Sequence, residues 1–462
     1  MVLAFPKAPL TPKEDPFYIA PDNLENYKLG DIIRSRNTPT KVRSIFVPLN
    51  LKYSWQLLVR SEDSFGNPNA FVTTIMEPYN ADPKKIVSYQ TFEDSADLNC
   101  SPSYGFLFGA SIATIATQIE MTSITLALQK GYYVVSPDYE GYKSAFAAGR
   151  QAGYATLNSI RAILNTKKLT GIDPDAKVAL LGYSGGSIAS SWANVLLNSY
   201  APEIEENIIG TVLGGFVTNI KSIAESVDGG LVAGLIPVAL TGLGNEYPEF
   251  KSAIEKEIDH DKDIYLKYAG QVGLAGAVLK YFGHRFLSGK NPLIPRGLDV
   301  LNEPTIDRIL KENSLLYLDT SKFKPTTPIF IYHGKLDHIV PIKDVKKIYQ
   351  LWSDAGVPSL EFAEDLLNGH ITEAVIGAPA AWTWIENRFN GIPPIKGCSH
   401  TSRAENILYP NVSKATFEYF KGLIKAITFA KIGYRGLSTD NISISAFKEL
   451  LGKLESYFSK DQ

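Results

Sequence analysis

The sequence predicts an α/β fold with a mostly parallel sheet and an inserted helical cap. Short apolar runs alternate with stretches whose apolar residues recur at helical spacing, which is typical of strand–helix–strand units. Between residues 215 and 315 the strand-like runs nearly cease, and Gly/Ala-rich apolar stretches flank a charged helical one. With 462 residues, 45% of them hydrophobic, the chain can bury a large core without disulfide or metal support.

Charge and hydropathy exclude several classes of protein. Lys and Arg number 46 against 48 for Asp and Glu, a net charge of −2, whereas nucleic-acid binding needs a strongly basic face. No uninterrupted apolar stretch approaches the ~20 residues of a membrane-spanning helix. The metalloprotease, P-loop and dinucleotide motifs are absent from the sequence. We therefore expect a soluble globular protein that uses neither a metal nor a cofactor and binds no nucleic acid.

The elements follow in order along the chain. Residues 1–40 contain six prolines and are expected to form an arm over the domain surface. Helices are expected over 155–165 and 187–200, where apolar residues keep helical spacing. Strands are expected at 44–50, 54–61, 70–78, 86–92, at the start of 131–141, at 177–183 and at the start of 327–341.

The near loss of strand-like runs between residues 215 and 315 divides the chain. We expect a core in two parts, 1–214 and 316–462, separated by a helical cap at 215–315. Extra core helices packed on the sheet are the alternative. A cap is preferred because ligand sites of open α/β sheets lie at the carboxyl ends of the strands, where an insertion can cover them.

The pentapeptide Gly182-Tyr183-Ser184-Gly185-Gly186 joins a buried apolar strand to a helix. In a nucleophile elbow this turn is so sharp that the serine is strained and flanking side chains would clash, which explains the glycines. Gly and Ser are common, so the pentapeptide alone is weak, but the strand before it and the helix after it favour an elbow over an ordinary turn. Ser184 is therefore the expected nucleophile.

A serine nucleophile needs a base and a carboxylate that orients the base, in the chain order Ser, Asp or Glu, His. Asp337 follows the strand at 327–334 and is the expected acid, with Asp344 and Asp365 as rivals. His370 opens a helical stretch and is the expected base. The other histidines fit less well by position: His333 on a strand, His338 beside the acid, His260 and His284 in the insertion, and His400 after the second cysteine.

The oxyanion of an acyl-transfer intermediate needs two hydrogen-bond donors. Gly185, the residue after the nucleophile, is expected to supply one backbone N–H. The second donor is expected from Glu93-Asp94-Ser95, in the loop after the strand at 86–92. Asp138 precedes the serine and is expected to anchor a loop instead.

Two cysteines, Cys100 and Cys398, can form one bridge or remain thiols. Asn99, Asn411 and Asn441 lie in glycosylation sequons, which tilt the expectation toward secretion. No signal peptide is visible at the first residues, so the sequence reads as a cytosolic protein or as a mature chain with an added Met.

Several longer segments together resemble the secretory lipases of Candida-type yeasts and lipase A of the Candida antarctica type. They include SYQTFEDSADLNCSPSY, GYYVVSPDYEG, the GYSGG elbow, LNEPTIDRILKEN, FIYHGKLDHIVP and GHITEA. The resemblance covers most of the chain, and these segments are far more specific than the elbow alone.

The resemblance implies an α/β-hydrolase in which Ser184, Asp337 and His370 form the triad and Asp94 and Gly185 the oxyanion hole. It also implies that 215–315 covers an acyl-binding tunnel, and that the chain is secreted, needs no cofactor and cleaves triacylglycerols and simpler esters at an oil–water interface. Water or a small alcohol would accept the acyl group. One departure is the cysteine count, because members of the family commonly form two bridges.

The sequence thus predicts a secreted serine lipase. The alternatives are an acyltransferase that prefers alcohol to water, or a short-chain carboxylesterase, on the same triad. A rival from another class is a non-catalytic binding protein of the same fold, but such proteins typically lack a triad member, and all three candidates are present here.

Overall fold

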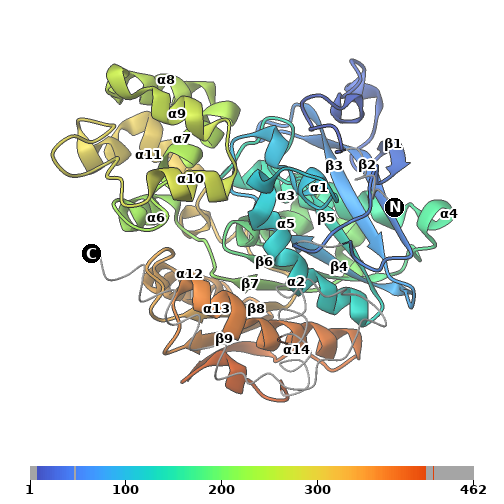
Figure 1. The fold of residues 1–462 in the computed structure, drawn as a ribbon. Helices are drawn as coiled ribbons and strands as arrows, with labels where there is room; N and C mark the ends of the chain where they lie inside the picture. Colours follow the sequence, from blue (N-terminus) through green and yellow to red (C-terminus); the bar gives the residue numbers. More distant parts are fainter. Residues whose placement is uncertain (1–7, 46–47, 413–419, 421–462) are drawn as a thin grey trace, which may run out of the picture.

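One sheet forms the centre of the protein (Figure 1). The computed structural model describes residues 8–45, 48–412 and 420, and within them ten strands pair in the order β1-β2-β3-β5-β4-β6-β7-β8-β9-β10. The strands are β1 Ile32–Asn37, β2 Tyr53–Glu62, β3 Pro68–Glu77, β4 Asp82–Gln90, β5 Tyr132–Pro137, β6 Lys177–Tyr183, β7 Ile208–Gly214, β8 Ile329–Gly334, β9 Ser359–Asp365 and β10 Gly397–Arg403.

The sheet is parallel from β5 to β10, and β1, β2 and β3 extend it in antiparallel fashion. The expected mostly parallel α/β architecture is therefore confirmed. Because β4, β6, β8 and β9 run in the same direction, the loops that follow them meet at one edge of the sheet. Every residue expected to carry chemistry lies in one of these loops or at the start of the helix that follows.

Residues 46 and 47 of the expected strand at 44–50 lie outside the described residues, and the described residues of that segment belong to no strand. Among the described residues around this segment, isolated bridges pair Arg43 with Pro48 and Val42 with Leu107. Pro48 has no backbone N–H to give to a ladder, which limits pairing there. The other expected strands are present, and β1, β7, β9 and β10 are strands that the sequence pattern did not indicate; β1 lies inside the proline-rich arm.

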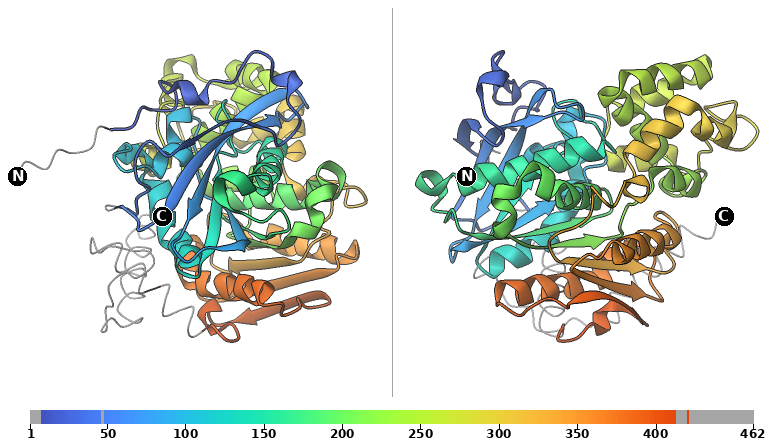
Figure 2. Two further views of the ribbon diagram at one scale, coloured as in Figure 1. Left: turned by 90° about the vertical axis from the view of Figure 1, so that its right-hand side faces the viewer. Right: turned by 180° about the vertical axis from the view of Figure 1, so that it is seen from behind.

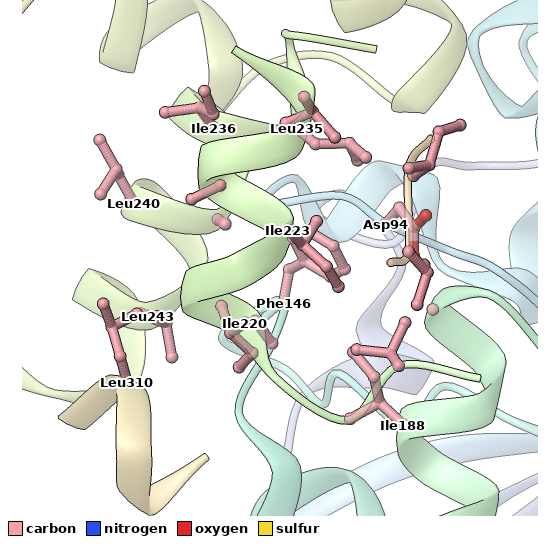
Figure 3. Close-up of a pocket in the computed structure, with 18 of the residues that line it drawn as sticks. Asp94, Phe146, Ile188, Ile220, Ile223, Leu235, Ile236, Leu240, Leu243 and Leu310 are labelled. Carbon is pink, nitrogen blue, oxygen red and sulfur yellow. The ribbon is translucent and has the colours of Figure 1, made fainter. Parts of the chain in front are cut away.

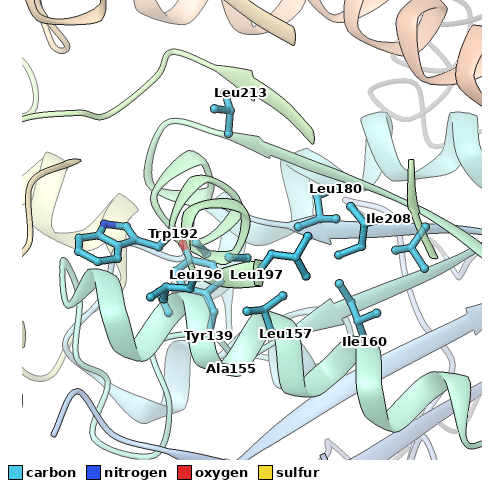
Figure 4. Close-up of a cluster of buried hydrophobic side chains, with 14 of the residues drawn as sticks. Tyr139, Ala155, Leu157, Ile160, Leu180, Trp192, Leu196, Leu197, Ile208 and Leu213 are labelled. Carbon is cyan, nitrogen blue, oxygen red and sulfur yellow. The ribbon is translucent and has the colours of Figure 1, made fainter. Parts of the chain in front are cut away.

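Helices cover both faces of the sheet. The face with α3 (Gly149–Leu164), α5 (Gly185–Tyr200) and α12 (Ile342–Asp354) contains one apolar cluster, in which Leu157, Trp192 and Ile348 are fully buried. Figure 4 shows Leu157 and Trp192 in this cluster. The opposite face is covered by α2 (Ile115–Gln129), α13 (His370–Ile376) and α14 (Ala378–Phe389), with a second cluster. Two short helices, α1 (Pro102–Gly105) and α4 (Lys167–Thr170), lie in connections.

Six helices lie between β7 and β8 and form a group beside the carboxyl edge of the sheet (Figures 1 and 2). They are α6 Ile220–Val227, α7 Leu235–Glu246, α8 Pro248–Glu257, α9 Ile264–Ala269, α10 Leu274–Tyr281 and α11 Pro304–Glu312. Most of a third apolar cluster comes from this group, and Phe146 and its neighbours in the sheet domain join it. The insertion therefore has its own core and packs on the edge that carries Ser184.

Candidate active site

Ser184 lies in a strained turn between β6 and α5. Its backbone has φ 51° and ψ −123°, in the left-handed half of φ space that residues with a side chain rarely occupy. A Cβ on Gly182 would lie 2.1 Å from the Gly186 carbonyl oxygen, and one on Gly186 would lie 2.0 Å from that of Gln90. The two glycines therefore let the backbone close tightly around the serine.

His370 and Asp337 meet Ser184 at the ends of neighbouring strands. Ser184 Oγ is 2.8 Å from His370 Nε2, and His370 Nδ1 is 2.6 Å from Asp337 Oδ2. Asp337 lies in the loop after β8, and His370 is the first residue of α13, after β9. Because an ionised carboxylate can only accept hydrogen bonds, Nδ1 carries the proton and Nε2 is free to accept that of the serine hydroxyl.

Asp337 is held in one orientation. Its Oδ1 accepts the backbone N–H groups of Ile339 at 2.9 Å and Val340 at 2.7 Å, so Oδ2 faces His370. Burial by itself would raise the pKa of Asp337. The charge of His370 and the hydrogen bonds that the Asp337 carboxylate accepts outweigh burial, so the pKa of Asp337 is lowered. The carboxylate therefore stays ionised.

A second histidine approaches the same carboxylate. His333 Nδ1 accepts the backbone N–H of Phe216 at 3.0 Å, so its proton is on Nε2, which lies 3.0 Å from the Val340 carbonyl oxygen and 3.4 Å from Asp337 Oδ2. Burial lowers the pKa of His333, which favours the neutral ring. The expected local bonding of His333 is present, because Asp337 and Val340 lie four and seven residues after it. Its bond from Phe216, in the loop after β7, has no signal in the sequence.

Asp94 and Gly185 lie together beside Ser184. Asp94 is in the loop after β4, at φ 44°, and among the described residues its buried Oδ1 has no hydrogen-bond partner. That oxygen lies 1.7 Å from where a Cβ of residue 185 would be, so only glycine fits there. Burial, opposed by the charge of His370, raises the pKa of Asp94 to about 7. Gly185 is the first residue of α5, where helix N–H groups point outward unpaired.

Two further groups support this arrangement. The Tyr183 hydroxyl donates to the backbone carbonyl of His370. Ser187 Oγ donates to the Ser184 carbonyl at 2.6 Å and accepts the N–H of Val217 at 3.0 Å. Tyr183 was expected only as part of the elbow, and the contacts of Ser187 are visible only in three dimensions.

An apolar cavity starts at Ser184, Gly185 and Asp94 and extends between the inserted helices (Figure 3). We call it the cap pocket. Nearly half of its lining residues belong to α6, α7 and α11, and Ile188 of α5 lies at its base in the sheet domain.

The other candidate residues for the triad either lie away from Ser184 or already have hydrogen-bond partners. Asp365 accepts the N–H groups of Leu367 and Asn368 and so caps its own loop. The side chain of Asp138 accepts from Ser103, which agrees with the expected loop anchor.

The remaining rivals do not reach Ser184. His338 is exposed, and His400 pairs with Glu364 at 2.7 Å. Asp344 belongs to the first turn of α12, where it faces Lys347. His260 and His284 belong to the insertion.

The two cysteines are free thiols in the structure, Cys100 buried and Cys398 half-buried in β10, so the bridge that the sequence allowed is not formed. Of the three sequon asparagines, Asn99 is half-buried and accepts the Lys13 N–H, Asn411 is exposed, and Asn441 lies outside the described residues.

The sheet order, the elbow after β6 and the helical insertion after β7 define an α/β-hydrolase. Among solved structures, Candida antarctica lipase A in its closed state matches with a TM-score of 0.79 and 32% identity, over 89% of this chain and 95% of that one. Lipase 1 of Candida albicans is 51% identical, over 98% of this chain and 96% of its own length, and Lipase 6 of that species is 50% identical, over 95% and 94%.

The family model described as "Secretory lipase" matches residues 106–397. The chain belongs to the secretory lipase family and is a hydrolase of the lipase type. Within the part of the chain that the structure describes, no helix has both the length and the apolarity needed to cross a membrane.

Proposed function

We propose that the protein is a secreted triacylglycerol lipase whose catalytic triad is Ser184, His370 and Asp337. The observation that carries this proposal is the continuous hydrogen-bonded chain from Ser184 Oγ through His370 to Asp337, with separations of 2.8 and 2.6 Å. The chain lies at the mouth of an apolar pocket. A nucleophile, a base and an oriented acid in this geometry support acyl transfer through a covalent acyl-enzyme.

In the proposed reaction, Ser184 Oγ attacks the ester carbonyl carbon and its proton passes to His370 Nε2. Asp337 stabilises the imidazolium, and the oxyanion binds near Gly185 N–H and Asp94. When the tetrahedral intermediate collapses, the carbon–oxygen bond to the alcohol breaks and His370 returns the proton to the leaving oxygen. Water, or an alcohol, then attacks the acyl-enzyme by the same steps in reverse.

The insertion at 215–315 is proposed to be a cap that holds the acyl chain. The cap pocket is almost entirely apolar and begins at the nucleophile, and each buried methylene contributes ~0.8 kcal/mol. The test compares triacylglycerols and simple esters from acetate to oleate, assayed by release of acid. Activity that rises with acyl length supports the lipase, and a maximum at acetate would favour the short-chain carboxylesterase.

Asp94 is proposed to act as a neutral donor to the oxyanion. A carboxylic acid donates a hydrogen bond only when protonated, and the pKa of Asp94 is about 7. We expect kcat/KM to decline by up to tenfold per pH unit as the pH rises above about 7, because Asp94 then becomes an anion. The prediction is checked by pH profiles of ester hydrolysis.

Two variants test this role. Asp94→Asn keeps a neutral donor at all pH values, so the decline above about pH 7 should disappear. Asp94→Ala removes the donor and should lower kcat by ~10²–10³-fold below about pH 7, and its difference from the wild type should narrow as the pH rises above about 7. An unchanged alkaline decline in Asp94→Asn would refute the proposal.

Secretion is proposed from the family and from the Candida relatives. Asn411, which is exposed, and Asn99 are the described positions available for glycosylation. Under this proposal residues 1–214 and 316–462 form the catalytic core around the cap.

Acyl transfer to an alcohol is a second candidate on the same triad. It is favoured by a further apolar pocket that contains His370, the group that must take the proton of an incoming alcohol.

A further inference from the structure

The fully buried ring of His333, on β8, has both of its nitrogens engaged. Nδ1 accepts the Phe216 N–H at 3.0 Å, and Nε2 lies 3.0 Å from the Val340 carbonyl oxygen. A backbone N–H can only donate and a backbone carbonyl can only accept. The two contacts therefore fix one neutral tautomer, with the proton on Nε2.

The Nε2–H of His333 is directed at the turn that carries the acid of the proposed triad. In that turn the N–H of Val340 donates to Asp337 Oδ1 at 2.7 Å, and the carbonyl of Val340 is the group that His333 binds. The same Nε2 lies 3.4 Å from Asp337 Oδ2, the oxygen that is 2.6 Å from His370 Nδ1. His333 therefore contacts both the end of the turn and the oxygen that faces the base.

The partner of His333 Nδ1 lies in the loop that leads from β7 into the insertion. Phe216 is fully buried and packs on Trp352 of α12 with ring centroids 5.7 Å apart, which holds its backbone N–H in place. The next N–H, that of Val217, donates to Ser187 Oγ, which itself donates to the Ser184 carbonyl. Two consecutive N–H groups of one loop therefore hold one group beside the acid and one beside the nucleophile.

We propose that His333 is a positioning residue of the triad. Its Nε2–H holds the turn from Asp337 to Val340 in the shape that keeps Oδ2 within hydrogen-bond distance of His370. This inference rests on the proposed function, and it adds a residue that acts on the reaction only through Asp337. Burial lowers the pKa of His333, so the ring stays neutral and does not compete as a cation for the carboxylate that His370 needs.

Amide side chains separate the roles of the two ring nitrogens. The amide of glutamine reaches the position of Nε2 and can donate there, whereas that of asparagine reaches only the position of Nδ1. We expect His333→Gln to keep kcat for 4-nitrophenyl hexadecanoate within about fivefold of the wild type. His333→Asn should lower kcat by about 10- to 100-fold and change KM by less than about threefold, because a small displacement of a catalytic group is costly.

A double-mutant cycle with Asp337→Asn separates positioning from a purely structural role. If His333 acts through Asp337, adding His333→Asn to Asp337→Asn should lower kcat by less than about a further twofold, because the effects of coupled residues are not additive. A histidine that only stabilises the fold would lower kcat by the same factor in both backgrounds. Thermal unfolding of each variant is measured alongside.

His400→Gln is the matched control. His400 also pairs with a buried carboxylate, its Nε2 lying 2.7 Å from Glu364 Oε2, but it belongs to β10 at the edge of the sheet. We expect this variant to keep kcat within about twofold in both backgrounds, since the pair orients no reacting group.

Three results would overturn the assignment: a wild-type kcat in His333→Asn, an equal loss in His333→Gln, and losses that multiply in the double variant. Wild-type activity in Asp337→Asn alone would instead refute the proposed triad, which is a different result. If His333→Asn does not fold by circular dichroism, His333→Leu takes its place, because leucine fills a similar volume and offers no donor.

Discussion

Replacing Ser184 with alanine is expected to lower kcat for ester hydrolysis by about 10⁴- to 10⁶-fold. The variant lacks the oxygen that forms the acyl-enzyme, so only binding and oxyanion stabilisation remain. The turn itself should survive, because its tightness comes from the missing side chains of Gly182 and Gly186. Hydrolysis of a long-chain ester, and the mass gained after treatment with a fluorophosphonate, measure the effect.

Ser191→Ala is the matched control for Ser184→Ala. Ser191 lies on the same helix α5, is fully buried and donates to the Ser187 carbonyl, away from His370. We expect this variant to keep its activity within about threefold, since changes remote from the reacting atoms remove no interaction made in the transition state. If Ser184→Ala keeps its activity and a fluorophosphonate labels another serine in it, Ser184 is not the nucleophile.

The second large effect is expected for Asp337→Asn, at about 10⁴-fold in kcat. The N–H groups of Ile339 and Val340 bind Oδ1 and will keep the amide oxygen of the asparagine in that place. The amide NH₂ must then face His370 Nδ1 and donate to it. This forces the proton of His370 onto Nε2, where it can no longer accept the proton of Ser184.

The rival acid supplies the control for Asp337→Asn. Asp344 is also buried and lies in the first turn of α12, beside Lys347. Asp344→Asn should leave kcat within a few-fold of the wild type, because the residue orients no reacting group. Equal losses in the two variants, measured with the same ester, would mean that Asp337 acts through stability and not through His370.

Much of the site could be predicted because its signals are local. The elbow is five consecutive residues between a buried strand and a helix, and the chain order Ser, Asp, His selects Asp337 and His370 from several alternatives. Strands β6 and β8 are apolar runs with clear ends. These features depend on neighbours along the chain.

The rest depends on tertiary contacts. Strand β9 contains Glu361, Glu364 and Asp365, and its buried Glu364 is tolerated only because Lys346 and His400 reach it from other elements. Strand β7 is glycine-containing and runs into the insertion without a visible break. The contact of His333 with Phe216 and the pocket on the His370 side both join elements that are far apart in the sequence.

The position of the helical insertion between β7 and β8 also sets when the protein can become active during its synthesis. The ribosome completes Ser184 and α5 before the insertion, whereas His370 follows Ser184 by 186 residues. A nascent chain therefore holds the serine without its base until β8, β9 and α13 have been added. Under the proposed mechanism, a newly made chain that still lacks α13 cannot cleave the lipid esters around it.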